Sequence, residues 1–203
     1  MQFSQRDPRW AADLLGSSEI TIGKAGCLVT AAAAMMADWG VATDPGRLNG
    51  WLRSHGGYVS DCLLRFGALA GLGAQCVGYV DCKAVPAPVT RMRDALSAGN
   101  VVLAAVDWSP GGTLQTHWVR VLALDERDGQ VMDPWQMPGK ELVKLSRYLA
   151  SDWDAARGIF EVAFYRKVGV TGGLPSTKEP EAQPPAYQGH LYLRPHGYFQ
   201  REP

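Results

Sequence analysis

Of all the residues in this chain, Cys27 is the one whose surroundings best suit a nucleophile. It stands where a glycine-containing loop meets the first strongly apolar segment, residues 25–37. A thiol in the first turn of a helix lies near free backbone N–H groups and the positive end of the helix dipole. Both favour the thiolate, which is the nucleophilic form. Gly26 beside it would let a substrate carbonyl approach; the alternative is a buried core cysteine.

A cysteine nucleophile needs a base, and His117 is the best placed of the four histidines. His190 and His196 lie in the C-terminal region, and His55 lies in a glycine-containing loop. His117 begins a predicted strand, in which successive side chains point to opposite faces, so Trp118 would face away from it. The strand backbone would then hold the imidazole in place. The alternative is a histidine of the core or of a sheet edge.

Asp133 is the predicted partner that orients this imidazole and selects its tautomer. It follows His117 by sixteen residues and ends the next predicted strand. The Asp-Gly pair at 128–129 predicts a hairpin turn between the two strands. A hairpin brings the start of one strand beside the end of the next, so Asp133 can stand next to His117. The alternative is an Asp that forms a turn before Pro134.

The elements that must position these side chains follow from periodicity and from helix-stop signals. Asp44 before Pro45 predicts a helix N-terminus, and Gly40 predicts a helix end. Helices precede most strands, which favours an α+β fold with an antiparallel sheet over a doubly wound parallel sheet. The predicted helices cover 25–39, 45–53, 61–70, 89–98 and 145–150, and the predicted strands cover 74–80, 101–108, 115–124, 130–132 and 159–166.

Composition divides the chain into a domain, residues 1–166, and an extended arm, residues 167–203. The arm holds six of the thirteen prolines and shows little periodicity. Proline-rich segments of this kind are extended and act as linkers or arms. The arm ends in several aromatic residues, so we expect it to lie against its own domain or against a protein partner. It could also cover the active site as a strap.

Charge and apolar patterning exclude several classes of protein. Twenty basic residues balance twenty acidic ones, so no basic excess predicts nucleic-acid or membrane-surface binding. The longest apolar stretch falls short of the roughly 20 residues that span a bilayer. No signal peptide is recognisable at the N-terminus, which predicts synthesis in the cytoplasm. Four cysteines predict a reduced compartment, and their spacing suggests no metal site; we expect no cofactor.

Several motifs together resemble the C39-like peptidases, a branch of the papain-like cysteine peptidases. The resemblance covers most of residues 3–165 and is most specific at the Gln-x-Asp-x-x-Trp opening and at Gly-Cys. The matching segments read QRDPRWA at 5–11, LG at 15–16, TIG at 21–23, GC at 26–27 and DPW at 133–135, together with Gly40, Asn49 and the strand of His117.

This resemblance implies a papain-like fold in which a Cys-bearing helix packs on an antiparallel sheet that carries His and Asp. Cys27 would be the nucleophile, His117 the base and Asp133 the orienting acid. Gln5 would supply an oxyanion-hole donor beside the Cys27 backbone N–H. Many papain-like enzymes carry this glutamine a few residues before the cysteine, whereas Gln5 comes from farther away in the chain.

The function that follows is a thiol hydrolase that cleaves peptide bonds without a cofactor. Its substrate would be a peptide, and the resemblance suggests the peptidoglycan stem peptides of bacterial cell walls. One alternative is a structural or assembly subunit of a phage-like particle, or of another complex, on a papain-like scaffold. Enzyme and particle could coexist, with the peptidase incorporated in a virion. An acyltransferase or amidase that uses the same three residues is a further alternative.

Overall fold

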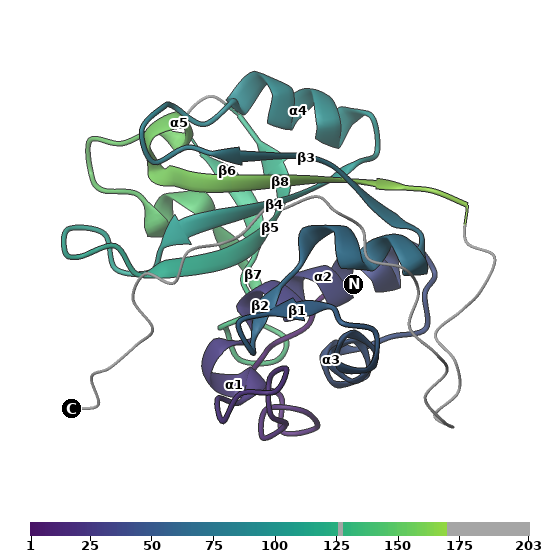
Figure 1. Cartoon of the computed structure of the whole chain (residues 1–203). Coiled ribbons are helices and arrows are strands. Elements are labelled where there is room, and N and C mark those ends of the chain that lie inside the picture. Colours follow the sequence, from purple (N-terminus) through teal and green to yellow (C-terminus); the bar gives the residue numbers. More distant parts are fainter. Residues whose placement is uncertain (126–127, 170–203) are drawn as a thin grey trace.

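A six-stranded antiparallel sheet forms the centre of the molecule, with strand order β3-β8-β4-β5-β6-β7 (Figure 1). The computed structural model describes residues 1–125 and 128–169, so the predicted arm lies almost wholly outside the described residues. The observed class is the predicted one, α+β with an antiparallel sheet. The strands are β3 (Ala74–Asp81), β4 (Val101–Asp107), β5 (Thr116–Leu124), β6 (Gly129–Met132), β7 (Leu142–Lys144) and β8 (Ile159–Lys167).

Helices cover both faces of this sheet. One face carries the helices of the N-terminal third, and the other carries two later helices (Figure 1). The first group is α1 (Ile22–Ala25), α2 (Cys27–Asp38) and α3 (Pro45–Ser54), and the second is α4 (Val89–Ser97) and α5 (Ala155–Gly158). A 3-10 helix, η2 (Leu145–Tyr148), follows β7. The Asp44 side chain caps α3 as predicted, accepting a hydrogen bond from the Arg47 N–H.

β4 is buried along its whole length and separates two apolar cores. Val101, Leu103 and Ala105 pack in the core that includes α2, while the alternate residues pack in the core that includes Met92 of α4. A strand covered on both faces needs apolar residues on both. This is why 101–106 reads as a continuous apolar run rather than as an alternating one.

α2 lies directly on the sheet and packs mainly against β5. Its four consecutive alanines, residues 31–34, are fully buried, so this turn of the helix is covered on all sides and leaves little room for larger side chains. The predicted helix 25–39 is divided in the structure, because α1 ends at Ala25 and α2 begins at Cys27. Gly40 follows α2 with a φ of +89°, the left-handed conformation expected of a glycine at a helix end.

The predicted helix 61–70 is wrong. A small hairpin of β1 (Tyr58–Val59) and β2 (Leu63–Leu64) precedes a 3-10 helix, η1 (Phe66–Leu72), in that region. Ser60 and Asp61 adopt positive φ values of 45° and 67°, which turn the chain and exclude a continuous helix.

The hairpin between β5 and β6 forms as predicted, but its turn is not the predicted Asp-Gly pair. Gly129 already belongs to β6 and pairs with Leu124, the last residue of β5. The closing bond of the hairpin runs from the Asp125 N–H to the Asp128 carbonyl, at 2.9 Å. Among the described residues, no helix is both long and apolar enough to cross a membrane.

We expect Ala32→Leu to destabilise the fold by about 1–3 kcal/mol, because a larger side chain must displace its neighbours at this fully buried position. The measurement is the urea midpoint with an unchanged slope. Ala37→Leu, at a half-buried position of the same helix, is the matched control and should change stability much less. Equal losses in the two variants would contradict the importance of close packing at the alanines.

Candidate active site

Cys27 is the first residue of α2 and is half-buried. The first backbone bond that leads into this helix runs from the Thr30 N–H to the Gly26 carbonyl, at 2.9 Å. The N–H groups of the first turn therefore have no acceptor within the helix. A side chain at Gly26 would lie 2.6 Å from the Ile22 carbonyl oxygen, so the tight junction between α1 and α2 requires glycine. The thiol thus sits at a helix N-terminus, as predicted.

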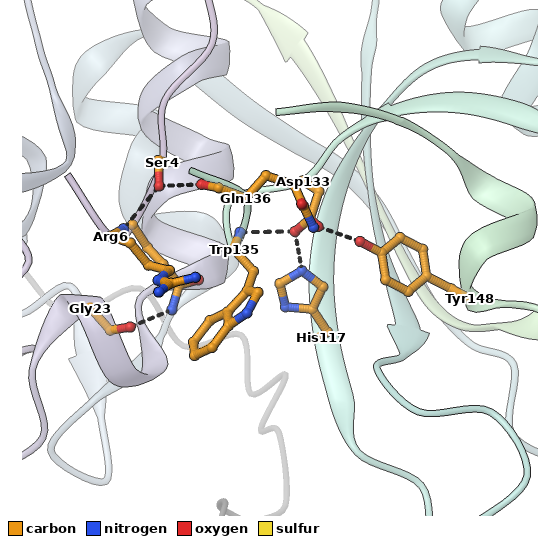
Figure 2. A network of polar contacts seen from close by, with 9 residues as sticks. Ser4, Arg6, Gly23, His117, Asp133, Trp135, Gln136 and Tyr148 are labelled. Atoms are coloured by element: carbon orange, nitrogen blue, oxygen red, sulfur yellow. Dashed lines mark hydrogen bonds and ion pairs between the residues drawn. The ribbon is translucent and has the colours of Figure 1, made fainter. Parts of the chain in front are cut away.

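His117 lies near the start of β5 and is 4% exposed. Its Nε2 contacts the Oδ1 atom of Asp133 at 2.6 Å (Figure 2). The Trp108 ring packs on the imidazole at 5.1 Å between ring centres and at 75° between ring planes. Trp118, the next residue along β5, packs in the core of α2. The alternation of the strand therefore separates these two side chains as predicted.

Asp133 is completely buried, and donors surround its carboxylate. Besides His117, its Oδ1 accepts the backbone N–H of Trp135 at 2.8 Å. Its Oδ2 accepts hydrogen bonds from the Gln136 side-chain amide and from the Tyr148 hydroxyl (Figure 2). Burial raises the pKa of Asp133, but these bonds and the charge of His117 outweigh it and lower the pKa. The group is therefore a carboxylate at neutral pH.

The imidazole of His117 is held in its charged form. Burial alone would lower its pKa, but hydrogen bonds with Asp133 and with Cys27, together with their charges, raise it to about 9. Because Nε2 is engaged by Asp133, Nδ1 is the nitrogen left for Cys27. The structure thus places His117 beside Asp133, and the effect of Cys27 on the pKa of the ring is what connects the thiol to this pair.

Gln5 is 1% exposed and lies between α1 and the loop that follows Asp133. Its Nε2 donates to the Gly23 carbonyl in α1 at 3.1 Å, and its backbone N–H donates to the Pro134 carbonyl at 2.7 Å. The Gly23 acceptor fixes which end of the amide is nitrogen. One hydrogen of Nε2 remains unused, and Oε1 is buried without a hydrogen-bond partner. The amide therefore keeps hydrogen-bonding capacity beside the segment that leads into Cys27.

Of the other three histidines, only His55 lies within the described residues. His55 stacks on Trp51, with ring centres 4.3 Å apart, at the end of α3. His190 and His196 lie outside the described residues. Within 1–125 and 128–169, no three His, Cys, Asp or Glu side chains form a group that could hold a metal ion.

Three supporting residues escaped the sequence analysis: Trp108, Gln136 and Tyr148. Gln136 follows Asp133 closely enough in the chain that its contact could have been considered. Trp108 and Tyr148 come from the end of β4 and from η2, and no spacing in the sequence indicates that they meet His117 and Asp133.

Comparisons with known proteins give limited information about this chain. No family model matches it, and no curated protein matches it. A solved structure from Bacillus anthracis, described as that of a candidate C39-like peptidase, is similar with a TM-score of 0.47 and 14% identity. The match covers 78% of this chain and 97% of that chain. At these values we draw no functional conclusion from the likeness.

We expect the His117 ring to lose its proton near pH 9, measured from the NMR signals of the histidine rings. Since the folded pKa exceeds the unfolded value of about 6.5, the charge stabilises the fold fully below about pH 6.5. This stabilisation is lost as the pH rises through about 9. Cys27→Ala removes one of the causes and should lower the pKa of His117. An unchanged pKa in that variant would contradict the contact between the two residues.

Proposed function

We propose that this chain is a papain-like cysteine peptidase of the C39-like type, with Cys27, His117 and Asp133 as its catalytic triad. The observation that carries the proposal is the contact of His117 with a buried carboxylate, together with the effect of the Cys27 thiol on the pKa of the same ring. One ring nitrogen contacts a buried carboxylate at 2.6 Å, and the thiol raises the pKa of the same ring. A nucleophile, a base and a group that orients the base are the parts that thiol catalysis requires.

In the reactive form that we propose, the Cys27 thiolate faces the imidazolium of His117, which carries a proton on Nδ1 as well as on Nε2. Asp133 stabilises the imidazolium and fixes the ring orientation through Nε2. Trp135, Gln136 and Tyr148 in turn hold the carboxylate, so it has little freedom to rotate. The base is therefore oriented before any substrate arrives.

The thiolate then attacks the carbonyl carbon of the scissile amide, and the carbonyl oxygen becomes an oxyanion. Two donors suit this charge: the Cys27 backbone N–H at the start of α2, and the unused hydrogen of Gln5 Nε2. The His117 imidazolium gives its proton to the leaving amine, and the C–N bond breaks. A thioester of Cys27 remains.

Water completes the cycle. His117 takes a proton from water, the hydroxide adds to the thioester carbon, and the C–S bond breaks to release a carboxylic acid and the thiolate. Transfer of the acyl group to an amine instead of water would make the protein a transferase. The products of a peptide incubated with the enzyme separate these two reactions.

The substrate class in this proposal is a peptide amide, and peptidoglycan stem peptides of bacterial cell walls remain our suggestion for its natural form. The prediction of a phage-like particle depends on residues 167–203, most of which lie outside the described residues.

Replacement of Cys27 by alanine should abolish turnover of peptide substrates without loss of the fold, because the side chain is half-buried and small. Release of fluorescent product and circular dichroism measure the two effects. Cys76→Ala, at another half-buried cysteine, should retain activity. Undiminished cleavage by the Cys27→Ala variant would disprove the proposal, as would failure of a thiol-directed reagent to prefer Cys27.

Gln5→Ala should lower kcat by about 10²–10³-fold with a smaller effect on KM, because one oxyanion donor is lost. Steady-state kinetics with one peptide substrate measure both constants. Gln130→Ala, at an exposed position of β6, is the control for loss of a glutamine side chain. A rise in KM with an unchanged kcat would instead assign Gln5 to substrate binding.

A further inference from the structure

Two arginines lie over two tryptophans beside His117. The guanidinium carbon of Arg6 is 5.2 Å from the centre of a Trp135 ring, and that of Arg147 is 5.8 Å from the centre of a Trp108 ring. The tryptophans contact each other edge to face, with ring centres 5.3 Å apart, and Trp108 packs on His117. In Figure 2, Trp135 lies between Arg6 and His117. Trp135 and Trp108 therefore form a series of ring contacts that runs from the two guanidinium groups to the ring of His117.

Neither arginine forms an ion pair with any residue that the structure describes. Both are exposed. Two other arginines that lie over tryptophan rings differ in this respect, because Arg9 pairs with Asp7 and Arg157 pairs with Asp152. The positive charge beside the candidate site is thus not neutralised by an ion pair within the described residues.

The carboxylates that lie close in the chain to Arg6, Trp108 and Trp135 already have hydrogen-bond partners. Asp133 accepts hydrogen bonds from four donors, and Asp7 binds Arg9 through both of its oxygens. Asp107, which precedes Trp108, uses its Oδ1 for the backbone N–H groups of Ser109 and Gln115. The full chain has a formal net charge of zero, so any attraction of an anion to these arginines is local.

We propose that Arg6 and Arg147 select substrates with a carboxylate close to the scissile bond. This inference rests on the proposed peptidase function and names its substrate class. A guanidinium presents paired N–H donors that match a carboxylate, and an aromatic face beneath it holds the cation in place. The tryptophan faces also offer apolar surface to the adjacent peptide. The carboxylate could be an acidic side chain or a free C-terminus.

A pair of alkylating reagents tests the charge effect without a known substrate. Iodoacetate and iodoacetamide transfer similar groups to a thiol and differ mainly in the negative charge. The quantity measured is the second-order rate constant for iodoacetate at Cys27 divided by that for iodoacetamide. Mass spectrometry of the Cys27 peptide follows both reactions. The imidazolium of His117 also attracts iodoacetate, but it is present in every variant compared.

We expect Arg6→Gln and Arg147→Gln each to lower this ratio by roughly threefold at low ionic strength, the size of an exposed charge interaction. The double variant should lower it further, and salt should reduce the difference between variants. Arg6→Lys keeps the charge and should keep most of the ratio. The matched control is Arg91→Gln, because Arg91 also lies over an aromatic ring, that of Phe164 at 4.2 Å, and packs on β3 and β8 away from the triad.

The outcomes separate the two proposals. If Cys27 is not alkylated in preference to the other cysteines, the proposed function fails and the inference fails with it. If Cys27 reacts preferentially but the ratio is the same in wild type and in the double variant, the arginines have no role in selection and the peptidase proposal stands.

Peptide pairs then distinguish the two sources of the carboxylate. One pair differs by Glu against Gln beside the cleaved bond, and the other by a free against an amidated C-terminus. We expect kcat/KM to favour the acidic member of at least one pair by roughly threefold to tenfold, and this preference to disappear in the double variant. Equal kcat/KM values within both pairs would overturn the inference.

Discussion

The contact between His117 and Asp133 is the interaction on which the site depends, because both partners are buried. A buried carboxylate is costly unless all of its acceptor sites are used. Here the remaining donors are the backbone N–H of Trp135, the side-chain amide of Gln136 and the hydroxyl of Tyr148. Breaking such a pair by removing one partner typically costs about 3–5 kcal/mol, so the site and the fold around it are not independent. β5, β6 and η2 must all be in place before the imidazole has its orientation.

The N-terminal segment completes this arrangement from the other side. Ser4 donates to the Gln136 carbonyl, and the Gln5 backbone donates to Pro134, so the segment is attached to the loop that follows Asp133. The Gln5 side chain reaches α1 through Gly23. The loop that carries the acid and the turn that leads into Cys27 are therefore linked through two consecutive residues. Gln5, although distant in sequence, is thereby held beside the segment that leads into Cys27 at the start of α2.

Local signals in the sequence were sufficient for the parts of this site that depend on local geometry. Glycine and an alanine run mark the start of α2, and two adjacent strands place His117 beside Asp133. The segment 61–70 was misassigned because two residues with positive φ, Ser60 and Asp61, make a hairpin there, and composition does not reveal them. Trp108 and Tyr148 were missed for a different reason. Their contacts with the site arise from packing between elements that no sequence spacing connects.

The two edges of the described sheet bear on how a peptide could be held. β7 has three residues, and β3 carries a bulge between Cys76 and Gly78 that interrupts its register with β8. Short or kinked edges are poor templates for an additional strand. The strands β5 and β6, which hold His117 and lead to Asp133, already have neighbours on each side. In the proposed peptidase, a peptide that reaches Cys27 would therefore be recognised through side chains and helix-end amides rather than by an added strand. A few surface substitutions would then suffice to change its sequence preference.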